Sequence, residues 1–278
     1  MIDEIIKIAF QEDFGDGDHS SNSCVPENAT GKAELLVKDE GIIAGVELAE
    51  RIFHHFDPTL EINVFIKDGA KVKYGDIVFE VAGKSRSILA TERLVLNFMQ
   101  RMSAIATKTN SYVEIMKGTN ANILDTRKTT PGLREFEKWA VRIGGGHNHR
   151  MGLYDMIMIK DNHIDYAGGI RQAIESANKY IKDNKLDIKI EIEARDEEEL
   201  KEILKVGQIH RIMLDNFTPE KIKEVLPLIP KEYETEASGN ITRETLRAYA
   251  ETGVNYISSG ALTHSIKSLD LSLKAIYN

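Results

Sequence analysis

The sequence has one cysteine and no long apolar run, and each shortage excludes a class of protein. Among 278 residues only Cys24 carries a thiol, so the chain has no intramolecular disulfide and no cysteine-based metal cluster. A single cysteine is typical of a reducing compartment, and we predict a cytoplasmic protein. No apolar run approaches the roughly 18 residues of a membrane span, and the start lacks the pattern of a signal peptide, so no membrane partner is expected.

The chain also lacks the net positive charge that nucleic-acid binding needs. Its 36 Lys and Arg are outnumbered by 44 Asp and Glu, which gives a net charge of −8 and an isoelectric point near 5.6. We therefore expect no nucleic-acid partner. Apolar residues make up 42% and charged residues 29%, an ordinary globular composition whose length suits one large domain or two smaller ones.

Positive charge is nevertheless concentrated in residues 126–150. This segment holds six basic residues against two acids, a local balance of 6 − 2 = +4 before its histidines are counted. Such a segment can gather a small polyanion, or it can be a solvated face that acids elsewhere balance, and charge alone leaves both open. The six are Arg127, Lys128, Arg134, Lys138, Arg142 and Arg150.

Residues 1–105 are predicted to form an α+β domain. Residues 1–11 have the pattern of an amphipathic helix, and a long helix is expected from near Thr91, because apolar residues recur there every three or four positions. The small residues at 103–106 are a candidate break in that helix. Strand-like runs precede it at residues 32–37, 60–66 and 77–81.

After Gly118 strands and helices alternate, which is typical of parallel strands joined by helical crossovers. The region has about 150 residues, short of the roughly 250 of an eight-stranded barrel, so an incomplete (β/α) barrel over residues 106–265 is predicted. The tail, residues 266–278, is expected to pack with the N-terminal domain. Thr218 and Thr242 are expected to cap helices. The strand candidates are 122–125, 156–160, 189–193, 211–215, 233–237 and 256–259.

Each of these strands ends in polar or small residues, and this pattern points to chemistry. The carboxyl ends of parallel strands meet at one mouth, where barrels and open α/β sheets bind ligands. Arg127, Arg150 and Arg93 offer guanidinium forks for carboxylate or phosphate. Lys128 and Lys160 offer point charges for the same groups.

Glu193 and Asp215 end successive strands and could hold Mg²⁺ or stabilise a developing sugar cation, with salt bridges to the lysines as the alternative. Ser238-Gly239 and Ser259-Gly260 follow the last two strands, where barrels often bind phosphate, although either pair can be an ordinary loop. His149 is expected to donate to a ligand carboxylate, because no spaced partner accompanies it as a metal ligand.

These residues leave the reaction open. Phosphoryl transfer, sugar-phosphate isomerisation and phosphoribosyl transfer all suit a cationic mouth with Mg²⁺, and Lys160 could serve an aldolase as a Schiff-base nucleophile. The motifs, however, strongly resemble quinolinate phosphoribosyltransferases, in order along nearly the whole chain. They include DTRKTTPG at 125–132, GGGHNHR at 144–150, IKDNH at 159–163, ASGNI at 237–241 and SGALTHS at 259–265.

The resemblance implies an N-terminal α+β open sandwich, an incomplete α/β barrel and a homodimer with shared active sites. It implies that quinolinate and phosphoribosyl pyrophosphate give nicotinate mononucleotide, pyrophosphate and CO₂ in de novo NAD synthesis, with Mg²⁺ as the cofactor. The implied quinolinate-binding residues are Arg93 of the partner subunit, Arg127, His149, Arg150 and Lys160. The implied phosphoribosyl pyrophosphate-binding residues are Lys128, Ser238, Gly239, Ser259, Gly260 and His264. The implied catalytic residues are Lys128, Lys160, Glu193 and Asp215, the two acids being the metal ligands.

Two other functions remain open beside this one. A paralogue of the same fold could act on another acceptor, as molybdenum-associated relatives do. A non-catalytic binding protein could keep the pocket, but a binder need not keep the whole charged set. The chain departs from the family pattern at Asn240 and Ala104, where glycine is common. Replacing glycine is costly only where φ must be positive.

Overall fold

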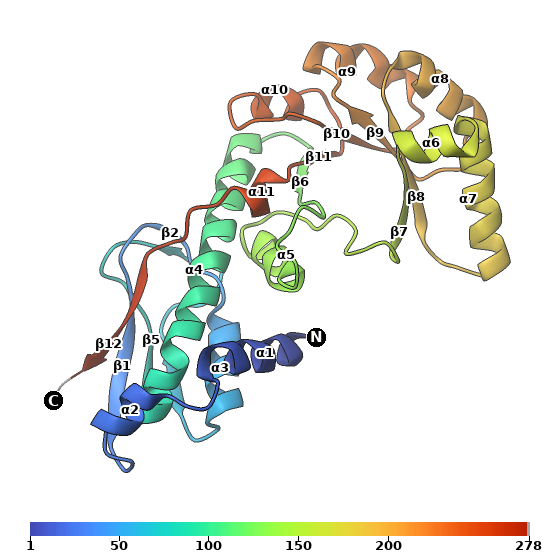
Figure 1. Ribbon diagram of the computed structural model, residues 1–278. Coiled ribbons are helices and arrows are strands. Elements are labelled where there is room, and N and C mark those ends of the chain that lie inside the picture. Colours follow the sequence, from blue (N-terminus) through green and yellow to red (C-terminus); the bar gives the residue numbers. More distant parts are fainter. Residues whose placement is uncertain (277–278) are drawn as a thin grey trace. The chain divides into compact units, whose positions relative to one another are not determined.

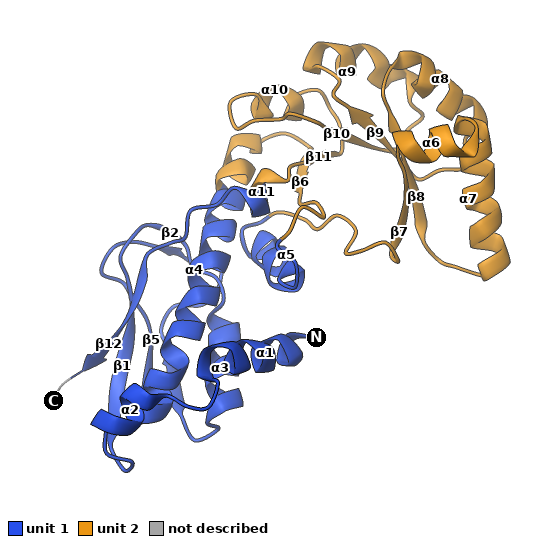
Figure 2. Cartoon of the chain, viewed as in Figure 1, with its two compact units in different colours: residues 1–110, 130–145, 262–278 blue, residues 111–129, 146–261 orange. Residues whose placement is uncertain are grey.

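The computed structural model describes residues 1–276, which form two compact units (Figure 1). Unit 1 comprises Met1–Asn110, Thr130–Gly145 and the C-terminal stretch from Leu262 (Figure 2). Unit 2 comprises Ser111–Thr129 and Gly146–Ala261. Among the described residues, no helix combines the length and the apolar character needed to cross a membrane.

Unit 1 is built on a four-stranded antiparallel sheet with the strand order β12-β1-β5-β3. The C-terminal strand β12 pairs with β1, so that Leu273 lies opposite Leu35, and both are buried. The strands are β1 (Thr30–Val37), β3 (Glu61–Val64), β5 (Ile77–Lys84) and β12 (Leu271–Ile276), with a separate pair of β2 (Gly41–Ile42) and β4 (Lys71–Val72). The helices of this unit are α1 (Ile2–Phe14), α2 (His19–Cys24), α3 (Val46–Phe56), the start of α4 (Ser85–Met116) and α5 (Arg134–Ile143).

Helix α4 begins six residues earlier than Thr91 and runs through residues 103–106 without a break. The expected break was wrong, because the small residues there are packing positions. Ser103 is fully buried, and its hydroxyl accepts a hydrogen bond from the Ala44 N–H at 2.9 Å. Thr107 makes the same kind of contact with the Ile42 N–H at 2.8 Å. Small polar side chains therefore let the β2 segment approach the helix closely.

A buried carboxylate fastens the end of α3 to the start of α4. Asp57 accepts hydrogen bonds from the Thr59 N–H at 3.0 Å, from the Thr59 hydroxyl at 2.6 Å and from the Ser87 hydroxyl at 2.7 Å. These bonds, the Thr59 hydroxyl foremost, lower the pKa of Asp57 from 3.8 to about 2. The fold therefore gains stability from the ionised form of this side chain.

Replacing Asp57 by alanine is expected to lower the free energy of unfolding at pH 7 by about 2 kcal/mol. Because the folded pKa is depressed, the wild-type contribution is complete above pH 3.8 and is lost as the pH falls through 2. Urea unfolding at pH 7 and between pH 5 and 2 measures both effects. Asp57→Asn keeps the shape without the titration, so its stability should fall less steeply with acid. Parallel pH curves for wild type and both variants would contradict the assignment.

Unit 2 is built on a six-stranded sheet with the order β6-β11-β10-β9-β8-β7, in which all neighbours are parallel. All six predicted strands are present within about one residue of their predicted ends. The predicted α/β class, with an antiparallel N-terminal sheet and a parallel C-terminal sheet, is thus confirmed. The strands are β6 (Asn122–Leu124), β7 (Met156–Ile159), β8 (Lys189–Ala194), β9 (Arg211–Asp215), β10 (Glu234–Ser238) and β11 (Tyr256–Ser258).

Helices connect most of these strands, and their caps decide where they begin. Thr218 caps α9 by accepting from the Lys221 N–H at 3.3 Å, as predicted. Thr242 does not cap a helix: its N–H donates to the Thr245 hydroxyl at 3.0 Å, which forms a turn, and α10 begins only after Thr245. The helices of unit 2 are α6 (Asp161–Ala167), α7 (Ile170–Asn184), α8 (Glu197–Val206), α9 (Pro219–Val225), the 3₁₀ turn η1 (Leu226–Leu228) and α10 (Leu246–Ala250). Helix α11 (Ala261–His264) begins at the last residue of unit 2 and continues in unit 1.

Strands β8, β9 and β10 carry polar residues at every second position, with Met213 of β9 as the apolar exception. Register pairing sets Arg211 beside Glu191 and Glu234, and sets Met213 beside Glu193 and Glu236. Since side chains alternate between the two faces of a sheet, these residues share one face. The other face of β8 and β9 is apolar and fully buried, with Ile190, Ile192, Ile212 and Leu214 on it. Residues of this polar face line the candidate site.

Candidate active site

A cavity of about 350 Å³ opens in unit 2 at the carboxyl ends of the strands. Seven predicted site residues line it, and they come from the loop after β6, the loop before β7 and the ends of β7, β8 and β10. These seven are Arg127, Lys128, His149, Arg150, Lys160, Glu193 and Ser238. Thr126, Met158, Met213, Glu236 and Ser258 complete the lining. The carboxyl ends of the strands thus surround a cavity.

The other predicted site residues do not line this cavity. Asp215, Gly239, Ser259 and Gly260 lie at neighbouring strand ends of the same unit. Arg93 and His264 belong to unit 1, the first exposed on α4 and the second at the end of α11.

Two guanidinium groups lie close to one another at this cavity. Arg150 is 9% exposed, and one of its nitrogens donates to the Met156 carbonyl at 3.2 Å. Burial, followed by the charge of nearby Arg127, lowers the pKa of the Arg150 guanidinium. Two like charges held together in this way form a site that an anion would stabilise.

A lysine and an acid meet at the ends of the neighbouring strands β7 and β8. The Lys160 ammonium contacts the Glu193 carboxylate, and Glu193 is 8% exposed. The Lys160 N–H donates to His163 Nδ1 at 3.0 Å, which fixes the backbone at the start of α6. Burial raises the pKa of Asp215 on the next strand, although the charge of Lys160 opposes the shift. The ion pair left open as an alternative thus forms at Glu193.

The His149 ring occupies the floor of the cavity and is held on both sides. Its Nδ1 accepts the Arg150 N–H at 2.6 Å, and its Nε2 lies 2.9 Å from Glu191 and 3.4 Å from Glu236. Both carboxylates are fully buried. The sequence predicted that His149 donates to a ligand carboxylate, whereas the structure turns Nε2 toward these internal acids.

The histidine and the two acids hold a proton between them. Burial opposes a charge on the ring, and the nearby acids favour one and raise the pKa of His149, but the Arg150 N–H that Nδ1 accepts keeps this nitrogen unprotonated, so the ring in this arrangement is a neutral imidazole. Burial and the charge of Glu236 raise the pKa of Glu191 to about 7. Its one hydrogen, on the His149 ring, therefore lies at Nε2, which faces Glu191 and Glu236. Such groups titrate as a unit.

Arg211 supplies the fixed positive charge of this buried cluster. Its Nη1 lies 3.2 Å from Glu236 and 3.9 Å from Glu191, and its Nε and Nη2 donate to Glu234 at 3.1 and 2.9 Å. The guanidinium carbon lies 4.2 Å from the centre of the Tyr256 ring. The ligand atoms of the histidine and the two buried acids lie within 4.8 Å of one another, which suits a metal. Arg211 already balances those acids, so we assign them to an internal ion network.

Asp125 orients the segment that carries His149. It is fully buried, and its Oδ1 accepts the His149 N–H at 2.9 Å. Its second oxygen accepts a hydrogen bond from the Asn148 side chain. The Asp125 N–H donates to the His147 carbonyl at 3.2 Å, so the end of β6 and the segment before β7 are joined.

Sequence reasoning missed Glu191, Arg211 and Glu236 as members of the site. The missed signal was alternation: strands buried on both faces of a parallel sheet normally read as continuous apolar runs. Here charged or polar residues hold every second position of β8 and β10, and two of the three such positions in β9. That pattern indicates a sheet whose inner face is polar.

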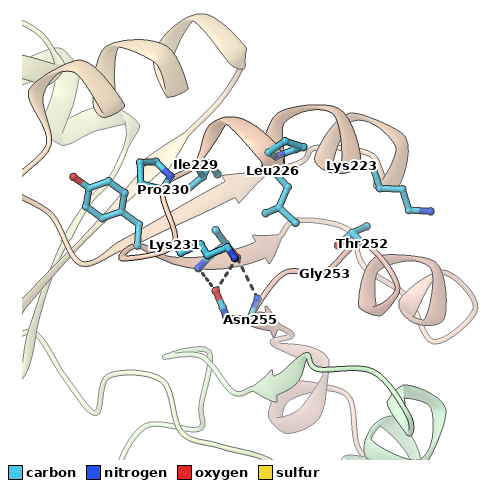
Figure 3. A pocket seen from close by; sticks show the side chains of 11 residues that line it. Lys223, Leu226, Ile229, Pro230, Lys231, Thr252, Gly253 and Asn255 are labelled. Atoms are coloured by element: carbon cyan, nitrogen blue, oxygen red, sulfur yellow. Dashed lines mark hydrogen bonds between the residues drawn. The ribbon is translucent and has the colours of Figure 1, made fainter.

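A second hollow, of about 720 Å³, lies at the amino ends of β10 and β11 (Figure 3). Its polar side chains serve the fold, because Asn255 accepts from the Thr235 N–H at 2.8 Å and from the Thr235 hydroxyl at 2.9 Å. The amino ends of barrel strands usually contribute stability and not chemistry. The cavity at the carboxyl ends is therefore the candidate active site.

Comparison with known families agrees with this geometry. Residues 105–274 match the model of the quinolinate phosphoribosyl transferase C-terminal domain, and residues 18–103 match that of the N-terminal domain. The chain belongs to the quinolinate phosphoribosyltransferase family. The resemblance seen in the motifs is thereby confirmed, over nearly the whole sequence.

Individual members of the family are similar along nearly the whole of this chain. The chain is 47% identical over 285 residues to the chloroplastic nicotinate-nucleotide pyrophosphorylase (carboxylating) of Arabidopsis thaliana, covering 97% of this chain and 81% of that protein. It is 44% identical to the probable nicotinate-nucleotide pyrophosphorylase of Bacillus subtilis, covering 98% and 93%. The crystal structure of NadC from Streptococcus pyogenes superposes with a TM-score of 0.94 at 40% identity, covering 100% and 97% of the two chains.

Proposed function

We propose that this protein transfers the phosphoribosyl group of phosphoribosyl pyrophosphate to quinolinate, with loss of CO₂, to give nicotinate mononucleotide and pyrophosphate for NAD synthesis. The observation that carries the proposal is the cavity that brings two guanidinium groups and a lysine-acid pair to one set of strand ends. Quinolinate is a dianion, and the sugar donor is a polyanion that loses pyrophosphate. A cavity with this charge distribution suits both.

The quinolinate carboxylates would bind Arg127, Arg150 and Lys160, with Arg93 contributed by the partner subunit. Guanidinium groups recognise carboxylates through paired hydrogen bonds. His149 belongs to this site through its neighbours: its ring fixes the Arg150 backbone and seals the floor of the cavity.

The phosphoribosyl pyrophosphate would lie along the strand ends of β9, β10 and β11. Its phosphates would contact six residues, Lys128, Ser238, Gly239, Ser259, Gly260 and His264. Glu193 and Asp215 would hold Mg²⁺, since carboxylate oxygens from adjacent strands are the donors that this ion prefers. When bound, the ion neutralises pyrophosphate charge.

The reaction follows from these charges. Lys128 and Lys160 stabilise the departing pyrophosphate, which takes the bonding electron pair and leaves cationic character on the sugar carbon. The buried carboxylate of Glu193 stabilises that cation. The quinolinate nitrogen then bonds to the sugar carbon, and the cationic ring accepts the electron pair released when the neighbouring carboxylate departs as CO₂. A proton finally replaces the lost carboxylate.

We further propose a homodimer with shared active sites, and a cytoplasmic location. The dimer rests on the family resemblance, and the location rests on the cysteine count. The names of two groups of plant relatives carry mitochondrial or chloroplastic locations, which are properties of those proteins.

Purified protein with both substrates and Mg²⁺ is expected to release CO₂ and pyrophosphate in equal amounts. Chelation of Mg²⁺ by EDTA should reduce the rate at least about a hundredfold, because the pyrophosphate charge is then poorly neutralised. Adding excess Mg²⁺ back is the control. Quinolinate should outcompete pyridine mono-acids, whereas a paralogue would prefer another acceptor. Binding of both substrates without any release of CO₂ would contradict the proposal and favour a binding protein.

A further inference from the structure

Two asparagines with left-handed backbones lie side by side at the mouth of unit 2. Asn216 has φ 59° and follows β9, and Asn240 has φ 51° and follows β10, the neighbouring strand. Left-handed non-glycine residues are uncommon, and such strain gathers at functional sites. Asparagine tolerates this region better than most residues, which explains how this chain replaces the glycine common in the family at position 240.

The side chain of Asn216 connects two parts of the proposed donor site. Its Nδ2 donates to Asp215 Oδ2 at 2.8 Å, and its Oδ1 accepts from Asn240 Nδ2 at 3.1 Å. Its N–H donates to the Ser238 carbonyl at 2.8 Å. A hydrogen-bonded chain thus joins the carboxylate on β9 to the turn after β10.

The turn after β10 has no space for a side chain at Gly239. A Cβ atom at this position would lie 2.2 Å from Asn216 Oδ1 and 2.9 Å from the Asn216 nitrogen, and the residue has φ 93°. The Asn216 amide therefore packs directly on the Gly239 backbone. This contact fixes the turn that carries Ser238 as well as the direction of the Asp215 carboxylate.

We propose that Asn216 is a positioning residue for phosphoribosyl pyrophosphate, holding the Asp215 carboxylate and the Ser238-Gly239 turn in one arrangement, with Asn240 as its second anchor. The inference rests on the proposed function, which puts the ribose and Mg²⁺ at Asp215 and a phosphate at the Ser238-Gly239 turn. Holding both in place before the ligand arrives lowers the ordering cost of binding. Quinolinate binding at Arg127 and Arg150 should not depend on this chain of amides.

Asn216→Gly keeps the positive φ and removes the amide, so it tests the side chain alone. It is expected to weaken phosphoribosyl pyrophosphate binding in the presence of Mg²⁺ about tenfold or more, while leaving quinolinate binding within about twofold. Isothermal titration with each substrate separately measures both values. Gln208→Gly is the matched control, because Gln208 also has a left-handed backbone, φ 58°, but lies in the turn before β9.

Asn240→Gly should weaken donor binding about threefold, and adding it to Asn216→Gly should have no further effect, since both act through one amide. In steady-state kinetics the loss should appear as a higher KM for the donor, with kcat changed less.

Equal losses of binding for both substrates, or a larger fall in Tm than the Gln208→Gly control shows, would indicate a structural role and overturn the inference. Unchanged donor binding in Asn216→Gly would overturn it too, while wild-type turnover still supported the proposed function. A wild type that does not bind the donor would overturn both.

Discussion

Replacing Arg211 by methionine is expected to lower the stability of unit 2 by about 3–5 kcal/mol. The guanidinium is 7% exposed and balances Glu236 at 3.2 Å and Glu234 at 2.9 Å. Methionine fills much of the volume but leaves two fully buried carboxylates, at positions 191 and 236, without their fixed cation. An uncompensated buried charge is costly, because the interior solvates it poorly. Urea unfolding followed by circular dichroism measures the loss.

Lys189→Met is the matched control for this variant. Lys189 also pairs with Glu234, at 3.5 Å, but its side chain is 54% exposed. Water screens such a pair, so its loss should cost less than about 1 kcal/mol. Glu236→Gln added to Arg211→Met should restore part of the lost stability, because it removes one of the orphaned charges. Equal losses for Arg211→Met and Lys189→Met would contradict the buried network.

The Arg211→Met penalty should also depend on pH, with a definite sign. The pKa of Glu191 is raised to about 7, so the carboxylate takes up a proton as the pH falls below neutrality. Protonation removes the charge that the variant leaves uncompensated. The penalty is therefore expected to be largest above pH 7 and to shrink toward pH 5. A penalty that is constant from pH 5 to 8 would argue against an ionised acid at this position.

The strand ends could be predicted from the sequence because topology alone determines where they meet. Once parallel strands are inferred, residues such as Arg127, Lys160 and Glu193 are brought to one edge whatever the details of packing. The floor of the cavity could not be predicted in this way. Contact between Glu191, Arg211 and Glu236 depends on the register of β8, β9 and β10, which the sequence pattern does not determine.

Local backbone chemistry was the other limit of the sequence. The apolar repeat predicts the position of α4. It does not show that the helix continues through Ser103, whose buried hydroxyl accepts a hydrogen bond from the Ala44 N–H. The sequence predicts that Thr242 caps a helix, but the Thr242 N–H donates to the Thr245 hydroxyl in a turn that precedes α10. Both errors concern short polar side chains, whose hydrogen bonds can serve either a helix or a loop.

Replacing Lys160 by methionine is expected to reduce kcat/KM at least about a thousandfold under the proposed function. Its ammonium contacts Glu193 and lines the cavity, so the variant loses a cation where pyrophosphate and quinolinate charges would be stabilised. Lys221→Met is the control, because Lys221 pairs with Glu197 and Glu224 in unit 2 and is not among the residues lining the cavity. Lys221→Met should change stability little, since this side chain is 40% exposed. Lys160→Met leaves the buried Glu193 carboxylate without its lysine, so some loss of stability is expected, and activity is compared at a temperature at which both variants are folded. Retained activity in Lys160→Met would remove this lysine from the mechanism.

The Lys160→Met chain also tests whether active sites are shared between subunits. Arg93 is exposed on α4 in unit 1, and the proposed dimer brings it into the partner's site. Arg93→Ala should therefore be nearly inactive alone. In a heterodimer of the two variants, one site receives both substitutions and the other receives neither. Random mixing makes half of the dimers mixed, so about one quarter of wild-type activity should return. Proven heterodimers without any recovery would refute the shared site and place Arg93 outside it.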